Sequence, residues 1–226
     1  MLPYFLDRSA PYIKLKYGVL QQDAVTINTG DLLMQNIINF ILEIDKLKGV
    51  TRKIRPCGLD RFENPAEHSW QIALFAKSMQ QYAESEIDID RVIKMLLVHD
   101  IGEIETGDTM FFVEHGLQER KAGELAAVKR IFGLLPEDHA EEFLCLWLEF
   151  EECKSIESRF AHAVDRAMPV ILNLANQGQS WRENGITYEK VIDKVSEPIK
   201  NGCPELWNYL ESKLLEAREK NHFGTE

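Results

Sequence analysis

Two histidines and two aspartates have the residue types and spacing to hold a metal ion: His68, His99, Asp100 and Asp165. His68 and His99 each lie on the apolar stripe of an expected helix, so both rings should point inward. Asp165 lies in an apolar helical pattern, where an unpaired carboxylate is costly unless it meets a cation. Two imidazole nitrogens with two carboxylates suit one divalent transition metal (Zn, Mn, Co, Ni or Fe) better than calcium.

Helices must position these side chains. Asn64, Pro65 and Glu67 predict a helix start, because they combine a capping box with a proline at the first helical position. That helix should run to about residue 82. Apolar periodicity predicts further helices over residues 31–48, 90–105, 118–132, 136–152, 155–176, 187–195 and 204–221.

The first thirty residues lack a sustained period and contain prolines and glycines, so residues 1–30 are expected to form an irregular N-terminal arm. A short strand or two within residues 11–28 is compatible with the pattern. The remaining residues, 31–226, read as one all-α domain, a helical bundle. The predicted fold class is therefore all-α with an N-terminal arm.

Composition narrows the function classes for these 226 residues. A net charge of −11 argues against a broad nucleic-acid-binding surface, which needs a clustered basic face. Apolar runs are too short for a membrane span, and the N-terminus lacks a secretory pattern, so a cytoplasmic protein is expected. Four scattered cysteines without a CxxC pair indicate neither a zinc ribbon nor a disulfide framework.

The ordered set of His68, His99-Asp100 and Asp165, all on expected helices, resembles the HD-domain metal-dependent phosphohydrolases. The text ENPAEHS, HDIGEIETGD and LWLEFEE is most similar to the YfbR-like and HD domain-containing protein 2 5′-deoxynucleotidases. The resemblance implies that the four residues hold one divalent cation. It also implies an HD-domain fold, a nucleoside monophosphate substrate and a homodimer.

The resemblance further implies catalytic roles for Glu103 and Asp108, the acidic residues of the HDxxExxxxD pattern. Glu103 follows His99 by four residues, so both are expected on the same helix face, with Glu103 one turn beyond the metal. There a carboxylate can orient or deprotonate a water that attacks phosphorus, and Asp108 can assist the leaving oxygen or the water. Without these roles, Glu103 would be a solvated helix-end charge and Asp108 an ordinary turn residue.

Phosphate recognition needs a fixed fork of donors, which arginine provides. Alignment of LKGVTR with the equivalent family segment places Arg52 on the substrate phosphate, with Arg55 as the second choice. Basic residues concentrate in the segment from Arg52 to Arg61 and not elsewhere around the motif. Three functions follow: a 5′-nucleotidase acting on (deoxy)nucleoside monophosphates, an HD-type hydrolase of another nucleotide (a deoxynucleoside triphosphate or a ppGpp-like compound), or a non-catalytic metal-stabilised interaction module.

Overall fold

A computed structural model describes residues 29–112 and 115–225, and within these ranges the chain is helical without strands. The all-α prediction is therefore confirmed, whereas residues 1–28, with the expected arm and strands, lie outside the described residues. The helices are α1 (Thr29–Ile44), η1 (Asp45–Gly49), α2 (Pro65–Met79), η2 (Gln80–Tyr82), α3 (Ile89–Val98), α4 (Glu103–Thr106), α5 (Leu117–Phe132), α6 (Glu137–Glu152), α7 (Ile156–Ala175), α8 (Gln179–Glu183), α9 (Tyr188–Gly202) and α10 (Pro204–Glu219).

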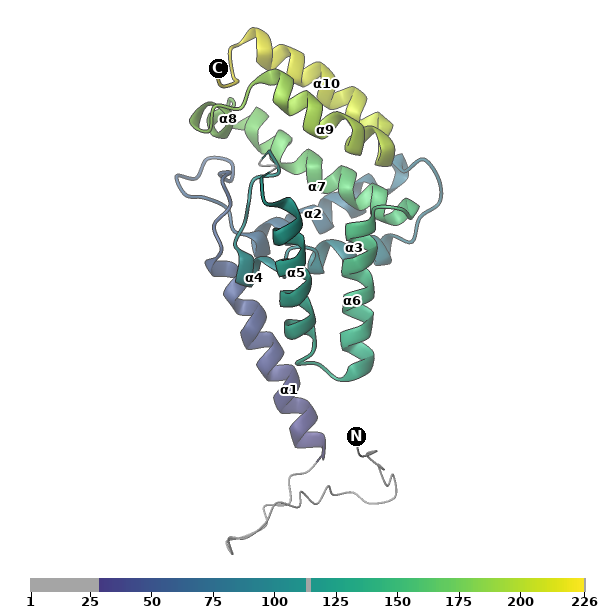
Figure 1. Ribbon diagram of the computed structural model, residues 1–226. Coiled ribbons are helices and arrows are strands. Elements are labelled where there is room, and N and C mark those ends of the chain that lie inside the picture. The colour runs from purple at the N-terminus through teal and green to yellow at the C-terminus, as the bar shows by residue number, and fades with distance from the viewer. Residues whose placement is uncertain (1–28, 113–114, 226) are drawn as a thin grey trace, which may run out of the picture.

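Helix α7 lies at the centre of the bundle. It packs against α2, α3, α6, α9 and α10, and Figure 1 shows it beneath α9 and α10. Its side chains Phe160, Val164 and Met168 belong to the main core. Because neighbours cover several sides of α7, even its charged Asp165 is buried, with 8% of its surface exposed.

The start of α2 follows the sequence prediction. Asn64 Oδ1 accepts a hydrogen bond from the Glu67 amide at 3.0 Å, and Glu67 Oε1 accepts one from the Asn64 amide at 2.9 Å. Pro65 occupies the first helical position. This capping box fixes the first turn of α2, and so places His68 in the interior with no exposed surface.

The helix expected over residues 90–105 is divided, so that prediction is wrong in part. Helix α3 ends at Val98, and α4 begins at Glu103. The His99 carbonyl, which would accept from the Glu103 amide in a continuous helix, accepts instead from Trp147 Nε1 at 3.0 Å. The Glu103 amide donates to the Asp100 carbonyl at 3.0 Å. Tertiary contact with α6 thus accompanies a break that local periodicity did not reveal.

Two further helices, α8 and α9, differ from the expectation. Helix α8 was not expected, and α9 continues through Pro198 to Gly202 rather than ending at Val195. At Gly202 a Cβ atom would lie 2.1 Å from the Arg159 carbonyl oxygen. Glycine at this position therefore lets the end of α9 approach α7 closely.

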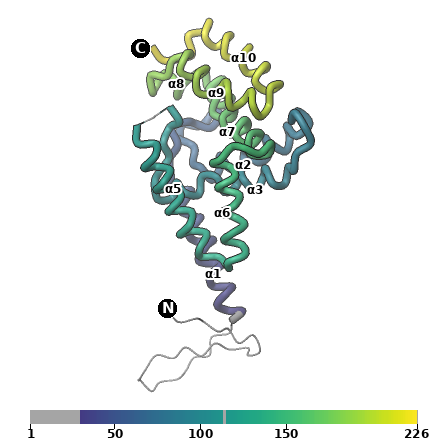
Figure 2. The backbone as a smooth tube through the Cα atoms, turned by 45° about the vertical axis from the view of Figure 1, so that its right-hand side comes forward, coloured from purple at the N-terminus to yellow at the C-terminus, as the bar shows by residue number. Residues whose placement is uncertain are grey.

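Helix α1 begins at Thr29, two residues before the expected start at Asp31. It projects from the bundle beyond the lower ends of α5 and α6 (Figure 2). Within the two described ranges, no helix combines the length and apolar character that crossing a bilayer requires.

Candidate metal centre and active-site pocket

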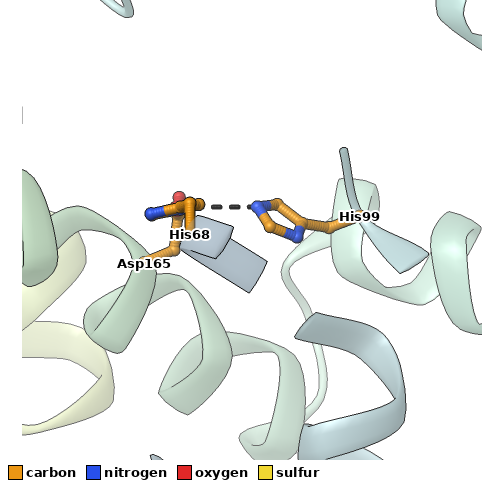
Figure 3. A group of neighbouring side chains, drawn as sticks. All are labelled: His68, His99 and Asp165. Atoms are coloured by element: carbon orange, nitrogen blue, oxygen red, sulfur yellow. Dashed lines mark hydrogen bonds and ion pairs between the residues drawn. The ribbon is translucent and has the colours of Figure 1, made fainter. Parts of the chain in front are cut away.

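Three buried side chains from separate helical segments converge on one point (Figure 3). They are His68 from α2, His99 directly after α3, and Asp165 from α7. His68 Nε2 lies 3.0 Å from Asp165 Oδ1, and His99 Nε2 lies 3.7 Å from the same oxygen. One ligand atom from each residue lies within 4.8 Å of the others, so the group could hold a metal ion.

The protonation of His99 fits a metal ligand. Its Nδ1 lies 2.9 Å from the Leu96 carbonyl, which can only accept, so Nδ1 carries a proton and donates. Nε2 faces carboxylate oxygens of Asp100 and Asp165, yet it has no hydrogen-bond partner among the described residues. A nitrogen lone pair and carboxylate oxygens repel one another unless a proton or a metal cation lies between the nitrogen and the oxygens. Although burial disfavours the charged ring, Asp100 and Asp165 raise the pKa of His99.

The surroundings of His68 also suit a metal ligand. Its Nε2 hydrogen-bonds Asp165 Oδ1 at 3.0 Å, and because a carboxylate only accepts, Nε2 is the donor there. Its Nδ1 lies 3.6 Å from Glu63 Oε2, so a carboxylate is also close to the nitrogen that must carry the proton when Nε2 binds a metal. Burial, assisted by the positive charge of Arg52, lowers the pKa of His68 to about 4. The ring is therefore neutral at pH 7, the form that coordinates a metal.

Asp100 lies beside the three-residue group rather than within it. Its Oδ1 is 3.0 Å from His99 Nε2, and its Oδ2 is 3.1 Å from Arg52 Nη1. One carboxylate therefore contacts both the candidate metal centre and the arginine expected to bind phosphate. The role of Asp100 as a fourth ligand stays a prediction.

Arg52 is buried among carboxylates. Its Nε lies 3.1 Å from Glu63 Oε2, and its Nη1 lies 3.7 Å from Asp108 Oδ1 in addition to the Asp100 contact. Backbone hydrogen bonds fix the segment, because the Arg52 amide donates to the Glu63 carbonyl at 2.9 Å. Burial opposes the charge, but Asp100, Asp108 and Glu63 raise the pKa of Arg52 further above its ordinary value. Arg52 is thus a permanent cation in a fixed orientation.

Arg55, the second choice for phosphate binding, lies in a different environment. Its guanidinium lies 4.7 Å from the Phe62 ring centroid, and Nη1 lies 3.3 Å from Glu183 Oε1. It does not line the pocket that contains Arg52 and His99. The structure therefore favours Arg52 over Arg55 for a ligand bound in that pocket.

A cavity of about 390 Å³ opens beside the metal centre. Glu103 and Asp108 line it, as do Arg52, His99, Asp100 and Asp165. The lining is completed by residues of α5, α6, α7, the turn before α4 and the loop after α4: Gly102, Thr109, Phe111, Leu117, Arg120, Lys121, Glu124, Phe150, Glu151, His162 and Arg166. Apart from the fully buried His68, all of the predicted site residues therefore line one pocket.

Burial raises the pKa of both carboxyl groups that are expected to transfer protons. Burial, with the charges of Asp100 and Asp108, raises the pKa of Glu103 to about 10. Burial also raises the pKa of Asp108, although Arg52 opposes the shift. Several carboxyl groups thus surround one arginine and two histidines, an arrangement that a divalent cation would neutralise. The donor set and its excess of negative charge fit a resident metal.

The pocket contains cations that sequence reasoning missed. Arg120 and Lys121 come from α5 and Arg166 comes from α7, so the expectation that basic residues concentrate in residues 52–61 is wrong for the folded site. Arg166 Nε lies 3.8 Å from Asp165 Oδ2, and its guanidinium lies 4.8 Å from the Phe111 ring centroid. Arg166 directly follows Asp165 in the chain, and that adjacency was the available signal.

Glu63 was also missed as a functional residue, although it is part of the ENPAEHS text. It is 2% exposed and contacts both Arg52 and His68. Burial raises the pKa of Glu63 to about 7, against the lowering effect of Arg52. A carboxylate directly before the N-cap of a histidine-bearing helix was the local signal.

Comparison with known proteins identifies the class. An HD domain family model matches residues 44–207, which include the metal centre and every predicted site residue. The chain therefore belongs to the HD domain family.

The names of individual relatives specify an activity for those proteins. Human 5′-deoxynucleotidase HDDC2 is 27% identical over 136 residues, which are 58% of this chain and 65% of the human protein. The Dictyostelium discoideum 5′-deoxynucleotidase HDDC2 is 28% identical over 72% of this chain and 89% of its own length. The chain thus spans just under two thirds of the human relative. A crystal structure of a predicted metal-dependent phosphohydrolase from Magnetospirillum magnetotacticum MS-1 is 37% identical, with a TM-score of 0.79, over 85% of this chain and 99% of that one.

Proposed function

We propose that this protein is a metal-dependent phosphomonoesterase, a 5′-nucleotidase that releases phosphate from (deoxy)nucleoside monophosphates. The observation that carries the proposal is His99 Nε2, which has no hydrogen-bond partner among the described residues and faces the carboxylates of Asp100 and Asp165 in a pocket that Arg52 also lines. A phosphate ester needs positive charge where negative charge develops. The relatives named as 5′-deoxynucleotidases support the substrate class.

His68, His99, Asp100 and Asp165 would hold one divalent cation. Two nitrogen and two oxygen donors suit Zn, Mn, Co, Ni or Fe. When bound, such a cation acts as a Lewis acid toward a phosphoryl oxygen and makes a nearby water more acidic. Glu63, through His68 Nδ1, would keep that ring in the ligating orientation.

The remaining pocket residues would bind substrate and move protons. Arg52 donates to phosphate oxygens from the fixed position that Glu63 and Asp100 give it. Glu103 would orient the attacking water, and would take its proton once the charge of a bound cation had lowered the pKa of this carboxyl group. Asp108, beside Arg52, protonates the leaving oxygen of the nucleoside, consistent with the raised pKa of its carboxyl group.

One observation favours a second candidate, the HD-type hydrolase of a longer phosphate chain. Arg120, Lys121 and Arg166 add positive charge to the pocket outside the Arg52 segment. Lys121 is paired with Glu151 at 3.0 Å, which partly offsets that charge. The monophosphate remains the first choice, because named relatives point to it and acidic side chains line the same region.

Phosphate release separates these candidates. Purified protein, stripped of metal and then loaded with zinc, manganese, cobalt or magnesium, is assayed against nucleoside and deoxynucleoside monophosphates, triphosphates and guanosine tetraphosphate. The proposal predicts metal-dependent release of inorganic phosphate from monophosphates. Turnover of triphosphates alone supports the second candidate, and nucleotide binding without turnover supports the non-catalytic interaction module.

The cytoplasmic location and the absence of a nucleic-acid polymer as partner stay predictions from the sequence. A homodimer is part of the proposal, as the resemblance to the 5′-deoxynucleotidases implies.

A further inference from the structure

We propose that the segment after α10, residues 222–224, positions the loop that carries Arg52. The segment acts through α8, which contacts both the segment and that loop. The inference rests on the proposed function, because Arg52 is taken there as the arginine that binds the substrate phosphate. Residues 222–224 lie outside the range 44–207 that matches the HD domain family, so membership of the family assigns them no role.

Helix α8 is too short to be stable by itself. It has five residues, whereas isolated helices shorter than about 12–15 residues are marginal in water. Its position therefore depends on neighbouring segments. Trp181 at its centre is 2% exposed, and the Trp181 amide donates a hydrogen bond to Asn173 Oδ1 of α7 at 3.3 Å. The Trp181 side chain also lines a small cavity together with Arg52, so a shift of α8 would alter the surroundings of that arginine.

The α8 region holds the loop that follows Arg52 through backbone carbonyls. Ser180 Oγ donates to the Lys53 carbonyl at 2.6 Å. Asn176 Nδ2, from the residue that ends α7 before α8, donates to the Arg55 carbonyl at 2.9 Å. Two of the three residues after Arg52 are therefore hydrogen-bonded to the α8 region. Displacement of α8 would move the backbone from which the Arg52 side chain extends.

The 222–224 segment covers another side of α8. The Phe223 ring stacks on the Trp181 indole, with ring centroids 4.5 Å apart and planes inclined by 12°. The Gly224 amide donates to the Ile186 carbonyl at 2.8 Å, and the Ile186 amide in turn donates to the Trp181 carbonyl at 2.8 Å. In Figures 1 and 2 the chain beyond α10 runs next to α8. The segment therefore holds Trp181 through both its ring and its backbone.

Glycines let the 222–224 segment approach the α8 region at backbone distance. A Cβ atom at Gly178, which directly precedes α8, would lie 1.7 Å from the His222 carbonyl oxygen. A Cβ atom at Gly224 would lie 2.7 Å from the Gly185 Cα. Atoms that are not bonded do not approach this closely, so both positions need a residue without a side chain. The segment consequently has one defined position on α8.

Replacement of Phe223 by alanine tests the proposal, because it removes the ring that stacks on Trp181. We expect KM for a deoxynucleoside monophosphate to rise about 3- to 10-fold, the change expected for loss of one ordinary hydrogen bond. Metal content and kcat should stay at the wild-type values, since a phosphate contact present in both substrate and transition state affects KM alone.

Two matched variants serve as controls. Phe223→Tyr keeps the ring, and Tyr209→Ala removes an aromatic side chain that is 62% exposed on α10. Both should show the wild-type KM. A role of Phe223 in stability alone predicts instead a lower kcat at unchanged KM, because only the fraction of folded enzyme would fall.

The combination of Phe223→Ala with Ser180→Ala tests the route through α8. Loss of the Phe223 ring and loss of the Ser180 hydroxyl should disturb the same contact with the loop. The rise in KM in the double variant should therefore be smaller than the product of the two single rises. Effects that simply multiply would show that Phe223 does not act through α8, and would overturn the proposal.

Hydrogen exchange monitors the loop without an assay of activity. The Arg52 amide donates to the Glu63 carbonyl at 2.9 Å, so a loop released from α8 should exchange this amide faster. We expect faster exchange over residues 52–55 in Phe223→Ala, with unchanged exchange in α3, and wild-type exchange throughout Phe223→Tyr. Should Phe223→Ala exchange faster everywhere, Phe223→Leu supplies the same comparison with a smaller loss of packing.

The outcomes separate this proposal from the proposed function. Wild-type exchange over residues 52–55 in the alanine variant, or a wild-type KM, overturns the positioning role. A wild-type protein that releases no phosphate refutes the proposed function alone, because hydrogen exchange still decides whether the 222–224 segment holds the Arg52 loop.

Discussion

Asp100 bridges His99 and Arg52: its Oδ1 lies 3.0 Å from His99 Nε2, and its Oδ2 lies 3.1 Å from Arg52 Nη1. Loss of the Asp100 carboxylate must therefore affect both His99 and Arg52. This carboxylate connects the proposed cation to the proposed phosphate-binding arginine.

Replacement of Asp100 by alanine should abolish metal binding and phosphate release together. The variant loses one proposed ligand and also the carboxylate that holds Arg52 in place. Metal content by inductively coupled plasma mass spectrometry and phosphate release from a deoxynucleoside monophosphate provide the readouts. An Asp100→Ala protein that is metal-free and fully active would refute the metal assignment.

Removal of the Glu103 carboxyl group should separate metal binding from turnover. Both Glu103→Ala and Glu103→Gln should keep the metal, because Glu103 is not a proposed ligand, and lose about 10²- to 10⁴-fold in kcat, as expected for a proton-transfer group. Equal metal content in variant and wild type is the control. Wild-type kcat in either variant would exclude the assigned role.

The pH dependence of stability in the metal-free protein should reveal Glu103. Its pKa is about 10 in the folded state and near 4.5 when exposed, so the folded protein holds an extra proton between these values. The unfolded state binds fewer protons there, and stability therefore falls as pH rises from 4.5 toward 10. Glu103→Gln should then be more stable than the wild type at pH 8, by on the order of 5 kcal/mol, with little difference near pH 4.

Urea unfolding of chelator-treated protein at both pH values measures this difference. A wild type and a Glu103→Gln variant whose stabilities change in parallel with pH would show that Glu103 is not the titrating group.

Arg52→Lys should weaken phosphate binding despite its conserved charge. Lysine cannot reproduce the forked contacts with Glu63 and Asp100, nor a two-point contact with phosphate. We expect kcat/KM to fall by about 10- to 100-fold, the equivalent of about 1.5–3 kcal/mol for a hydrogen bond to a charged group. Arg55→Lys, outside the pocket, is the matched control and should leave kcat/KM unchanged.

Arg166→Met should affect longer phosphate chains more than monophosphates, if the extra cations serve a second phosphate. The methionine keeps apolar contact with Phe111 and removes the charge. KM values for a monophosphate and the matching triphosphate, measured side by side, provide the test. A uniform change for both substrates assigns Arg166 to the reacting phosphate instead.

The metal-site candidates were recoverable from sequence because each lies within a strong local pattern. The capping box at Asn64 fixed the start of α2 and the inward direction of His68, and the apolar run around Asp165 marked it as buried. These signals are encoded within a few residues of each side chain. They needed no knowledge of how the helices pack.

The features that the sequence reading missed depend on packing between distant segments. The turn between α3 and α4 accompanies a hydrogen bond from Trp147, far along the chain, so periodicity alone predicted one helix. Glu103 consequently reaches the pocket from the start of α4 rather than from the face of His99. Likewise Arg120 and Arg166 line the same pocket because α5 and α7, distant in the chain, both contribute to its wall.

The most direct test of the central claim is the metal dependence of phosphate release from a deoxynucleoside monophosphate. Chelator-treated protein is titrated with each divalent cation while bound metal and released phosphate are measured in the same sample. Without metal we expect no release of phosphate, and with metal we expect a rise that saturates at one cation per chain. Full activity in metal-free protein, or stoichiometric metal binding with no release from any nucleotide tested, would contradict it.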